Sequence, residues 1–214
     1  MPVPSVTAPV RPPRPAPDDR VKRVFDVLLA TVLLLLTAPL MAAVAVAVAV
    51  GLGRPVLFRQ CRIGRADRPF ELVKFRTMRE PRGTLTSDAD RITPLGRWLR
   101  ATSLDELPTL WNVVRGDMSL VGPRPLLPEY LGRYSPTQAR RHEVRPGVTG
   151  LAQVRGRNSL DWDDKLALDV EYVRHRSLRL DLSILAATVR TVLRREGISA
   201  AGSATAPEFL GSRR

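Results

Sequence analysis

Residues 27–52 form a nearly unbroken apolar run, which only Thr31, Thr37 and Pro39 interrupt. As an α-helix this run would be roughly 35–40 Å long, enough to cross the hydrocarbon core of a bilayer, about 30 Å thick. It begins too late and is too long for a cleaved signal peptide, and no small-residue cleavage site precedes the polar sequence that follows. The run therefore predicts a membrane-embedded segment near the start of the chain.

Two features of the run bear on whether it spans the membrane or turns back. Pro39 lies near its middle, where a proline removes a helical hydrogen bond and kinks or breaks the helix. Basic residues flank both ends: Arg20, Lys22 and Arg23 before the run, and Arg54, Arg59, Arg62 and Arg65 after it. A single span is the default interpretation, but the positive-inside tendency places both flanks in the cytoplasm. The flanks therefore favour a re-entrant helix hairpin over residues 21–53, broken at Pro39.

The rest of the chain divides by composition into two tails and one domain. Residues 1–20 are rich in proline and poor in large apolar side chains, which predicts a disordered tail. Residues 54–200 read as a soluble domain, and residues 201–214 as a short C-terminal tail. The length leaves little room for a second full domain.

Local patterns in residues 54–200 predict an α+β domain with short β segments and several helices. The β-like segments are 55–60 and 70–76, separated by a turn that contains Gly and Asp. Helical spacing covers 95–100, 108–115, 160–174 and 180–196, whereas 80–90, 119–130 and 144–157 are expected to be loops. The last helix is amphipathic and is expected to face the core or a membrane surface with Leu182, Leu185, Val189, Val192 and Leu193.

The net charge of +13 comes mostly from arginine. A charge of this size implies an anionic partner, such as nucleic acid, an anionic lipid surface or a phosphorylated substrate, but does not choose among them. The single cysteine, Cys61, excludes an internal disulfide. The two histidines, His142 and His175, are separated and lack nearby cysteines, which argues against a zinc site.

Two adjacent acids, Asp105 and Glu106, lie just ahead of the helix expected from Pro108. A helix N-terminus attracts anions, a carboxylate can accept a phosphoryl group, and paired carboxylates suit magnesium. The structural alternative is a capping box, because Ser103 precedes Glu106 by three residues. The tetrapeptide alone leaves both interpretations open.

Basic residues recur beside turns and strands throughout the domain. Lys74 and Arg76 alternate with an apolar residue, so they share one face of the expected strand. Arg124 stands between two prolines, which stiffen the backbone around it. Arg145 and Arg157 also lie next to turn residues. Together with Arg62 these segments indicate a polyanionic ligand, since a preorganised guanidinium loses less entropy when it binds phosphate.

The order of these segments resembles that of the bacterial sugar transferases, in particular the small monotopic polyprenol-phosphate phosphoglycosyl transferases. The resemblance extends from Lys22 to about Ile198 through seven motifs in order: KRVFD, RQCRIG, KFRTM, TSLDELPTLWNVVRGDMSLVGPRP, RHEVRPGVTGLAQVRGRN, LDVEYV and SLRLDL. Residues 205–211 also resemble the C-terminal stretch of small members that initiate glycoprotein glycans.

The resemblance implies a two-step transfer of a phosphosugar from a UDP-sugar to polyprenol phosphate at the cytoplasmic face of the bacterial membrane. Asp105 is the expected nucleophile, which releases UMP, and Glu106 is the expected Mg²⁺ ligand. Arg100, Arg124 and Arg157 are expected to contact phosphates, with Lys74 and Arg76 as weaker candidates. The product would be polyprenol-diphosphate-sugar, the first membrane intermediate of a polysaccharide or glycoprotein glycan.

The chain departs from the family pattern at two positions. Ala38 stands before Pro39 where the family has serine, and Cys61 replaces the acid common in the RQxRxG motif. Two rival hypotheses remain: a direct transfer in which Asp105 acts as a base, and a basic membrane-tethered scaffold that binds nucleic acid. The scaffold hypothesis leaves the acid pair and the ordered motifs unexplained, so no nucleic-acid partner is expected.

Overall fold

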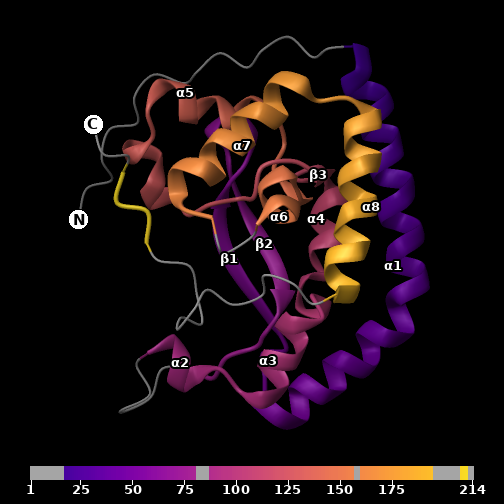
Figure 1. Cartoon of the computed structure of the whole chain (residues 1–214). Coiled ribbons are helices and arrows are strands. Elements are labelled where there is room, and N and C mark those ends of the chain that lie inside the picture. Colours follow the sequence, from indigo (N-terminus) through magenta and orange to yellow (C-terminus); the bar gives the residue numbers. More distant parts are fainter. Residues whose placement is uncertain (1–16, 81–86, 157–159, 195–207, 212–214) are drawn as a thin grey trace.

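Helix α1 (Pro17–Leu52) runs the height of the computed structural model, which describes residues 17–80, 87–156, 160–194 and 208–211 (Figure 1). By length and composition it is able to cross a membrane. Most of the expected N-terminal tail, residues 1–16, lies outside the described part, while residues 17–20 belong to α1. The predicted apolar anchor is therefore a helix, and it starts earlier than the apolar run.

The break expected at Pro39 is not confirmed, because α1 is continuous through this residue. The helix nevertheless changes direction in its lower part (Figure 1). Two residues before the proline, the Thr37 hydroxyl donates to the Leu33 carbonyl at 2.7 Å. Such back-bonding to the preceding turn favours helix bending. The re-entrant hairpin therefore stays a prediction, and the structure supplies a bent helix rather than two separate arms.

Strands β1 (Leu57–Ile63) and β2 (Pro69–Phe75) match the two predicted β segments, with boundaries shifted by up to three residues, and they pair as an antiparallel hairpin. The turn between them contains the short helix η1 (Arg65–Asp67), in which Ala66 and Asp67 have left-handed backbone angles. Among the residues that the structure describes, strand β2 pairs only with β1, so its other edge needs different hydrogen-bond partners.

Helix α4 (Thr109–Arg115) supplies the partners for that free edge of β2. The Thr109 hydroxyl donates to the Val73 carbonyl at 3.1 Å, and the Val73 amide donates to Asn112 Oδ1 at 3.1 Å. Asn112 also donates from Nδ2 to the Glu71 carbonyl at 2.7 Å. The helix ends at Gly116, as predicted, where φ is 102°. These side-chain bonds fix the position of α4, and hence of the acid pair before it, relative to β2.

The expectation that 119–130 and 144–157 are loops is wrong for residues 119–121, 147–149 and 151–155. Strands β3 (Ser119–Val121) and β4 (Gly147–Thr149) pair in parallel, and α6 (Leu151–Arg155) follows. The backbones approach so closely that a Cβ on Gly147 would lie 2.1 Å from the Gly122 amide. Three-residue strands are too short to show a periodic pattern, and glycines that serve close approach look like loop residues in the sequence.

The remaining helices surround these strands. Their bounds are α2 Asp88–Arg91, α3 Pro94–Ala101, η2 Leu104–Glu106, η3 Pro128–Arg133, α5 Pro136–Ala139, η4 Arg140–Glu143, α7 Trp162–His175 and α8 Leu178–Arg194. In the view of Figure 1, α8 runs alongside α1, and the two helices meet where Lys22 contacts Asp181. On the expected apolar face of α8, Leu182 and Val189 are exposed while Leu185 packs against the core, and the buried Ile184 lies outside that face. The alternative that this face lies on a membrane surface stays a prediction.

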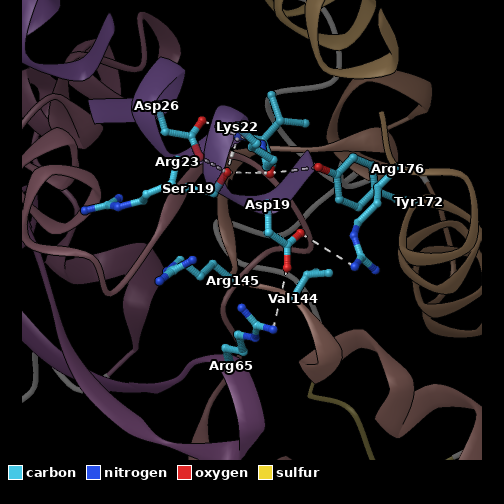
Figure 2. Close-up of a pocket in the computed structure, with 11 residues that line it drawn as sticks. Asp19, Lys22, Arg23, Asp26, Arg65, Ser119, Val144, Arg145, Tyr172 and Arg176 are labelled. Atoms are coloured by element: carbon cyan, nitrogen blue, oxygen red, sulfur yellow. Dashed lines mark hydrogen bonds and ion pairs between the residues drawn. The ribbon is translucent and has the colours of Figure 1, made fainter. Parts of the chain in front are cut away.

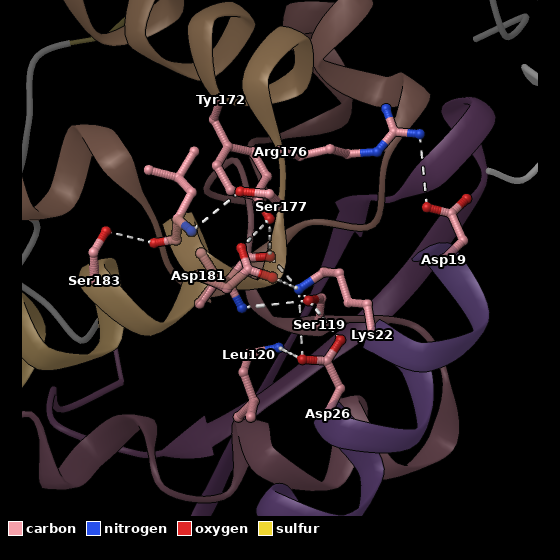
Figure 3. A network of polar contacts seen from close by, with 12 residues as sticks. Asp19, Lys22, Asp26, Ser119, Leu120, Tyr172, Arg176, Ser177, Asp181 and Ser183 are labelled. Carbon is pink, nitrogen blue, oxygen red and sulfur yellow. Dashed lines mark hydrogen bonds and ion pairs between the residues drawn. The ribbon is translucent and has the colours of Figure 1, made fainter. Parts of the chain in front are cut away.

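A buried polar network ties the start of α1 to three later elements (Figure 3). Lys22 on α1 lies 2.7 Å from Asp181 on α8, which also accepts a 2.7 Å hydrogen bond from the Tyr172 hydroxyl on α7. Asp26, one turn after Lys22, accepts a 2.8 Å hydrogen bond from Ser119 on β3. These contacts set the angle between the anchor helix and the domain.

Candidate active site

Asp105 and Glu106 belong to the short helix η2, between α3 and α4. Ser103, which precedes it, has a left-handed backbone with φ of 57° and turns the chain sharply there. The Asp105 side chain is buried, at 6% exposure. Burial, together with the negative charge of Glu106, raises the pKa of Asp105 to about 6, against the opposing effects of Lys74 and Arg100. The acid is thus poised near neutral pH in a dry environment.

The capping-box interpretation of the acid pair is wrong. Ser103 makes no side-chain hydrogen bond to the helix start. Glu106 instead faces two cations, with its Oε1 at 2.7 Å from Arg124 Nη2 and at 3.9 Å from Lys74 Nζ. Both acids lie inside η2, and both are influenced by the cations Lys74 and Arg124 rather than serving as caps of a helix end.

Three of the predicted basic residues gather around the acid pair. Lys74 projects from β2 and is largely buried, which lowers its pKa despite the neighbouring Glu106. Arg124 follows β3 in the Gly-Pro-Arg-Pro loop and is about half exposed; the contact with Glu106 raises its pKa. Arg100, near the end of α3, donates from Nε to the Thr77 hydroxyl at 3.0 Å and also acts on Asp105. The structure thus places their charges together, while their roles stay predictions.

The structure does not bring Arg76 to the acid pair. Its side chain is buried, and its guanidinium donates to the carbonyls of Leu52, Gly53 and Arg54 at the end of α1. Arg76 follows the last residue of β2, so the strand alternation that pairs it with Lys74 does not continue to it. Arg157, the remaining predicted phosphate ligand, lies outside the described residues.

Two residues that the sequence reasoning did not single out support this arrangement. Arg141 is 2% exposed and donates to the main-chain carbonyl of Arg124 at 2.6 Å. Its Nε and Nη2 both contact the Asp169 carboxylate on α7, at 3.1 Å and 2.7 Å. Both residues lie inside matched motifs, RHEVRPG and LDVEYV, which was the only signal available in the sequence.

The donor groups fit one kind of metal site. Within the described ranges, no group of three or more His, Cys, Asp and Glu side chains is arranged to hold a metal ion. Magnesium, however, commonly takes one or two carboxylates and completes its octahedron with water and phosphate oxygens. Adjacent Asp105 and Glu106 fit that pattern, so the site suits a Mg²⁺ ion that arrives with a phosphorylated ligand rather than one held by protein alone.

A second polar region, at the start of α1, is distinct from the acid pair (Figure 2). It encloses a cavity of about 30 Å³, enough for one or two water molecules. Asp19 lies 3.7 Å from Arg65 and 3.6 Å from Arg176, while Arg23 and Arg145 donate to carbonyls at the end of α4. These charges are committed to holding α1 in place, so the acid pair is the better candidate for chemistry.

The fold and site define a class: an α+β protein with one helix long and apolar enough to cross a membrane, and a buried acid beside cationic side chains suited to phosphates. The sequence profile of the family described as bacterial sugar transferase matches residues 17–195. The chain therefore belongs to the bacterial sugar transferase family, and the family predicted from the motifs is confirmed.

Three relatives illustrate the similarity. The chain is 50% identical over 194 residues to the uncharacterised sugar transferase EpsL of Bacillus subtilis, and this alignment covers 89% of this chain and 96% of that protein. It is 46% identical over 195 residues to a UDP-glucose:undecaprenyl-phosphate glucose-1-phosphate transferase of Caulobacter vibrioides, covering 85% and 72%. It is 38% identical over 196 residues to an undecaprenyl-phosphate galactose phosphotransferase of Salmonella typhimurium, covering 82% and 41%.

Proposed function

We propose that this chain transfers a phosphosugar from a UDP-sugar to polyprenol phosphate, releasing UMP, as the first membrane step of a bacterial glycoconjugate pathway. Two relatives whose names state such an activity support the substrate classes. Their names state glucose for one and galactose for the other, so membership of the family does not identify the sugar that this chain transfers. In this proposal, the two phosphorylated substrates and the membrane are the anionic partners that the net positive charge of the chain implies.

The observation that carries the proposal is a buried, desolvated Asp105 within the influence of Lys74, Arg100 and Arg124. A carboxylate freed from water is a stronger nucleophile, and the surrounding cations lower the repulsion between it and an incoming diphosphate. In the described part of the chain, exposed ion pairs such as Arg59 with Glu71 and Arg155 with Glu171 lack this combination of burial and convergent charge.

In the proposed mechanism, Asp105 attacks the sugar-proximal phosphorus of the donor. A bond forms between the carboxylate oxygen and phosphorus, the bond to the UMP oxygen breaks, and the electron pair leaves with UMP. The phosphate oxygen of the polyprenol acceptor then attacks the same phosphorus and restores the Asp105 carboxylate. Lys74, Arg100 and Arg124 hold the phosphates and offset the charge that moves between them.

Glu106 is the proposed Mg²⁺ ligand, with Asp105 beside it. When bound, the ion would neutralise negative charge on the donor phosphates. In the protein alone, Arg124 and Lys74 compensate the charge of Glu106. The same two cations therefore keep the carboxylate in place before donor and metal arrive.

The anchor helix α1 places this site at the cytoplasmic face of the membrane in the proposed arrangement. The basic flanks of the apolar run and the bend of α1 support a re-entrant segment. A site held at the surface by such a segment meets the phosphate end of a lipid acceptor without the protein crossing the bilayer.

The test is UMP release from a panel of UDP-sugars by the full-length protein in detergent or nanodiscs with Mg²⁺ and polyprenol phosphate. Asp105→Asn is expected to lower turnover at least about a thousandfold, because the amide cannot form the phosphorylated intermediate. Glu106→Gln is expected to raise the Mg²⁺ concentration needed for half-maximal activity. Full activity of Asp105→Asn would eliminate Asp105 as the nucleophile.

A direct transfer with Asp105 as base is the alternative, and the raised pKa of Asp105 suits that role as well. The two mechanisms differ when the acceptor is withheld. A covalent intermediate releases about one equivalent of UMP per enzyme and leaves the phosphosugar on the protein, whereas direct transfer releases none.

A further inference from the structure

Arg62 lies against the candidate active site without a role in the proposal above. It occupies the penultimate position of β1, where the Ile63 amide donates to the Leu126 carbonyl at 3.1 Å. That backbone bond holds the loop that carries Arg124 alongside the end of β1. Two guanidinium groups from distant parts of the sequence are thereby brought together.

The contacts of Arg62 leave its charge poorly compensated. Its Nη2 donates to Gln60 at 2.6 Å, and its Nη1 makes a long contact of 3.3 Å with the Pro125 carbonyl. Within the described part of the chain its buried Nε has no hydrogen-bond partner, and no carboxylate lies within ion-pair distance. Burial and the like charge of Arg124 lower its pKa to about 10.

A partly buried guanidinium whose Nε is fully buried without a partner is costly for the free protein. A buried donor without a partner loses its hydrogen bonds to water and gains none in the protein, and two adjacent guanidinium groups repel each other. An anion placed between Arg62 and Arg124 would satisfy both conditions at once. Uncompensated charges of this kind are common at binding sites, where the ligand supplies the missing contacts.

The position of Arg62 indicates which part of the ligand it contacts. Lys74 pairs with Phe58 in the hairpin, so Arg62 lies four residues further along β1, a distance of about 13 Å. Lys74, Arg100 and Arg124 all act on Asp105, whereas the charge of Arg62 acts on Lys74 and is itself influenced by Arg124 and Glu106. Arg124 thus acts on both Asp105 and Arg62.

We infer that Arg62 binds the nucleotide-side phosphate of the UDP-sugar, paired with Arg124, and holds the UMP leaving group. This inference rests on the proposed function, in which Asp105 attacks the other phosphate. As the bond to UMP breaks, an additional negative charge appears on the departing phosphate, and the guanidinium of Arg62 stabilises it. Arg62 would therefore act on donor binding and on UMP departure, but not on the reaction of the acceptor.

The experiment measures UMP binding to the full-length protein by calorimetry, together with thermal unfolding of the same samples. Arg62→Met removes the charge and keeps the apolar stem, and Arg62→Lys keeps the charge without the planar donor fork. Arg59→Gln is the matched control, because Arg59 lies on the same strand but is exposed and paired with Glu71 on the surface. UMP binding is expected to weaken about 10-fold to 100-fold in Arg62→Met and about tenfold in Arg62→Lys, and not in Arg59→Gln.

Thermal unfolding separates a ligand-binding role from a structural one. If Arg62 serves the ligand, Arg62→Met keeps or raises the midpoint of unfolding without UMP and loses the stabilisation that UMP gives the wild type. Wild-type UMP affinity in folded Arg62→Met or Arg62→Lys would overturn the inference. Absence of UMP binding and of UMP release in the wild type would instead overturn the proposed function, so the two failures are distinct.

Discussion

Arg141 donates a 2.6 Å hydrogen bond to the main-chain carbonyl of Arg124, the residue whose side chain contacts Glu106. Asp169 on α7 fixes the same guanidinium through two hydrogen bonds. A buried ion pair between η4 and α7 therefore holds the backbone of a loop that carries an active-site cation. This link joins segments that are 28 residues apart in sequence at the ion pair and 17 apart at the carbonyl contact.

Arg141→Lys is expected to raise KM for the UDP-sugar roughly tenfold, because lysine cannot hold both the Asp169 carboxylate and the Arg124 carbonyl. Asp169→Asn is expected to destabilise the fold by roughly 3–5 kcal/mol, since it leaves a buried guanidinium without its counter-ion. Arg140→Gln is the control, because neighbouring Arg140 pairs with Glu143 near the surface. Initial rates on folded protein check this; an unchanged KM in Arg141→Lys would show that Arg141 supports only the fold.

Lys74 and Arg76 are expected to behave differently on substitution, although they are two residues apart. Lys74→Gln should lower kcat/KM about 10-fold to 100-fold with little loss of stability, because Lys74 lies in the charged site. Arg76→Gln should lower the free energy of unfolding by roughly 2–3 kcal/mol, because it leaves carbonyls at the end of α1 without donors. Activity assays and chemical denaturation measure the two effects, with exposed Arg79→Gln as the control. Equal effects on activity would contradict the separation.

His142 is expected to make stability depend on pH. Burial lowers its pKa, and Arg141 adds to this, while the 2.6 Å contact with Asp67 offsets part of the effect. Because the folded-state pKa is lowered, the contribution of His142 is fully present above about pH 6.5, the value in the unfolded chain, and is lost as pH falls below it. The midpoint temperature of unfolding of His142→Gln should therefore fall less between pH 7.5 and pH 5.0 than that of the wild type.

The comparison for this experiment is His175→Gln, since His175 is exposed at the end of α7. This variant should follow the wild-type profile. A pH profile of His142→Gln that is parallel to the wild type would rule out the contribution assigned to His142.

The membrane path of α1 is open to a direct test. In a Cys61→Ser background, single cysteines at the exposed positions Arg20 and Arg54 mark the two flanks of the apolar run. A re-entrant segment predicts that an impermeant maleimide labels both positions in inside-out vesicles and neither in intact spheroplasts. Labelling of the two flanks from opposite sides would establish a single span instead.

The sequence was sufficient for much of the local structure. The two β segments that became β1 and β2, helix α4 with its Gly116 end, and helices α7 and α8 follow from patterns within a few residues, and the structure confirms them. The parallel pair of β3 and β4 could not be predicted in this way. It depends on the close approach of Gly122 and Gly147, which are far apart in the chain.

The same distinction applies to the site. The sequence by itself determined the acid pair, the supply of basic residues and, through the order of motifs, the family. Only the tertiary structure decided which basic side chains meet Asp105 and Glu106: it brought in Lys74 and Arg124, added Arg62 and turned Arg76 away. The physical reason is that contacts between distant segments direct these long side chains. Here Asn112 on α4 bonds to the edge of β2, and Arg141 bonds to the main chain of the loop that carries Arg124.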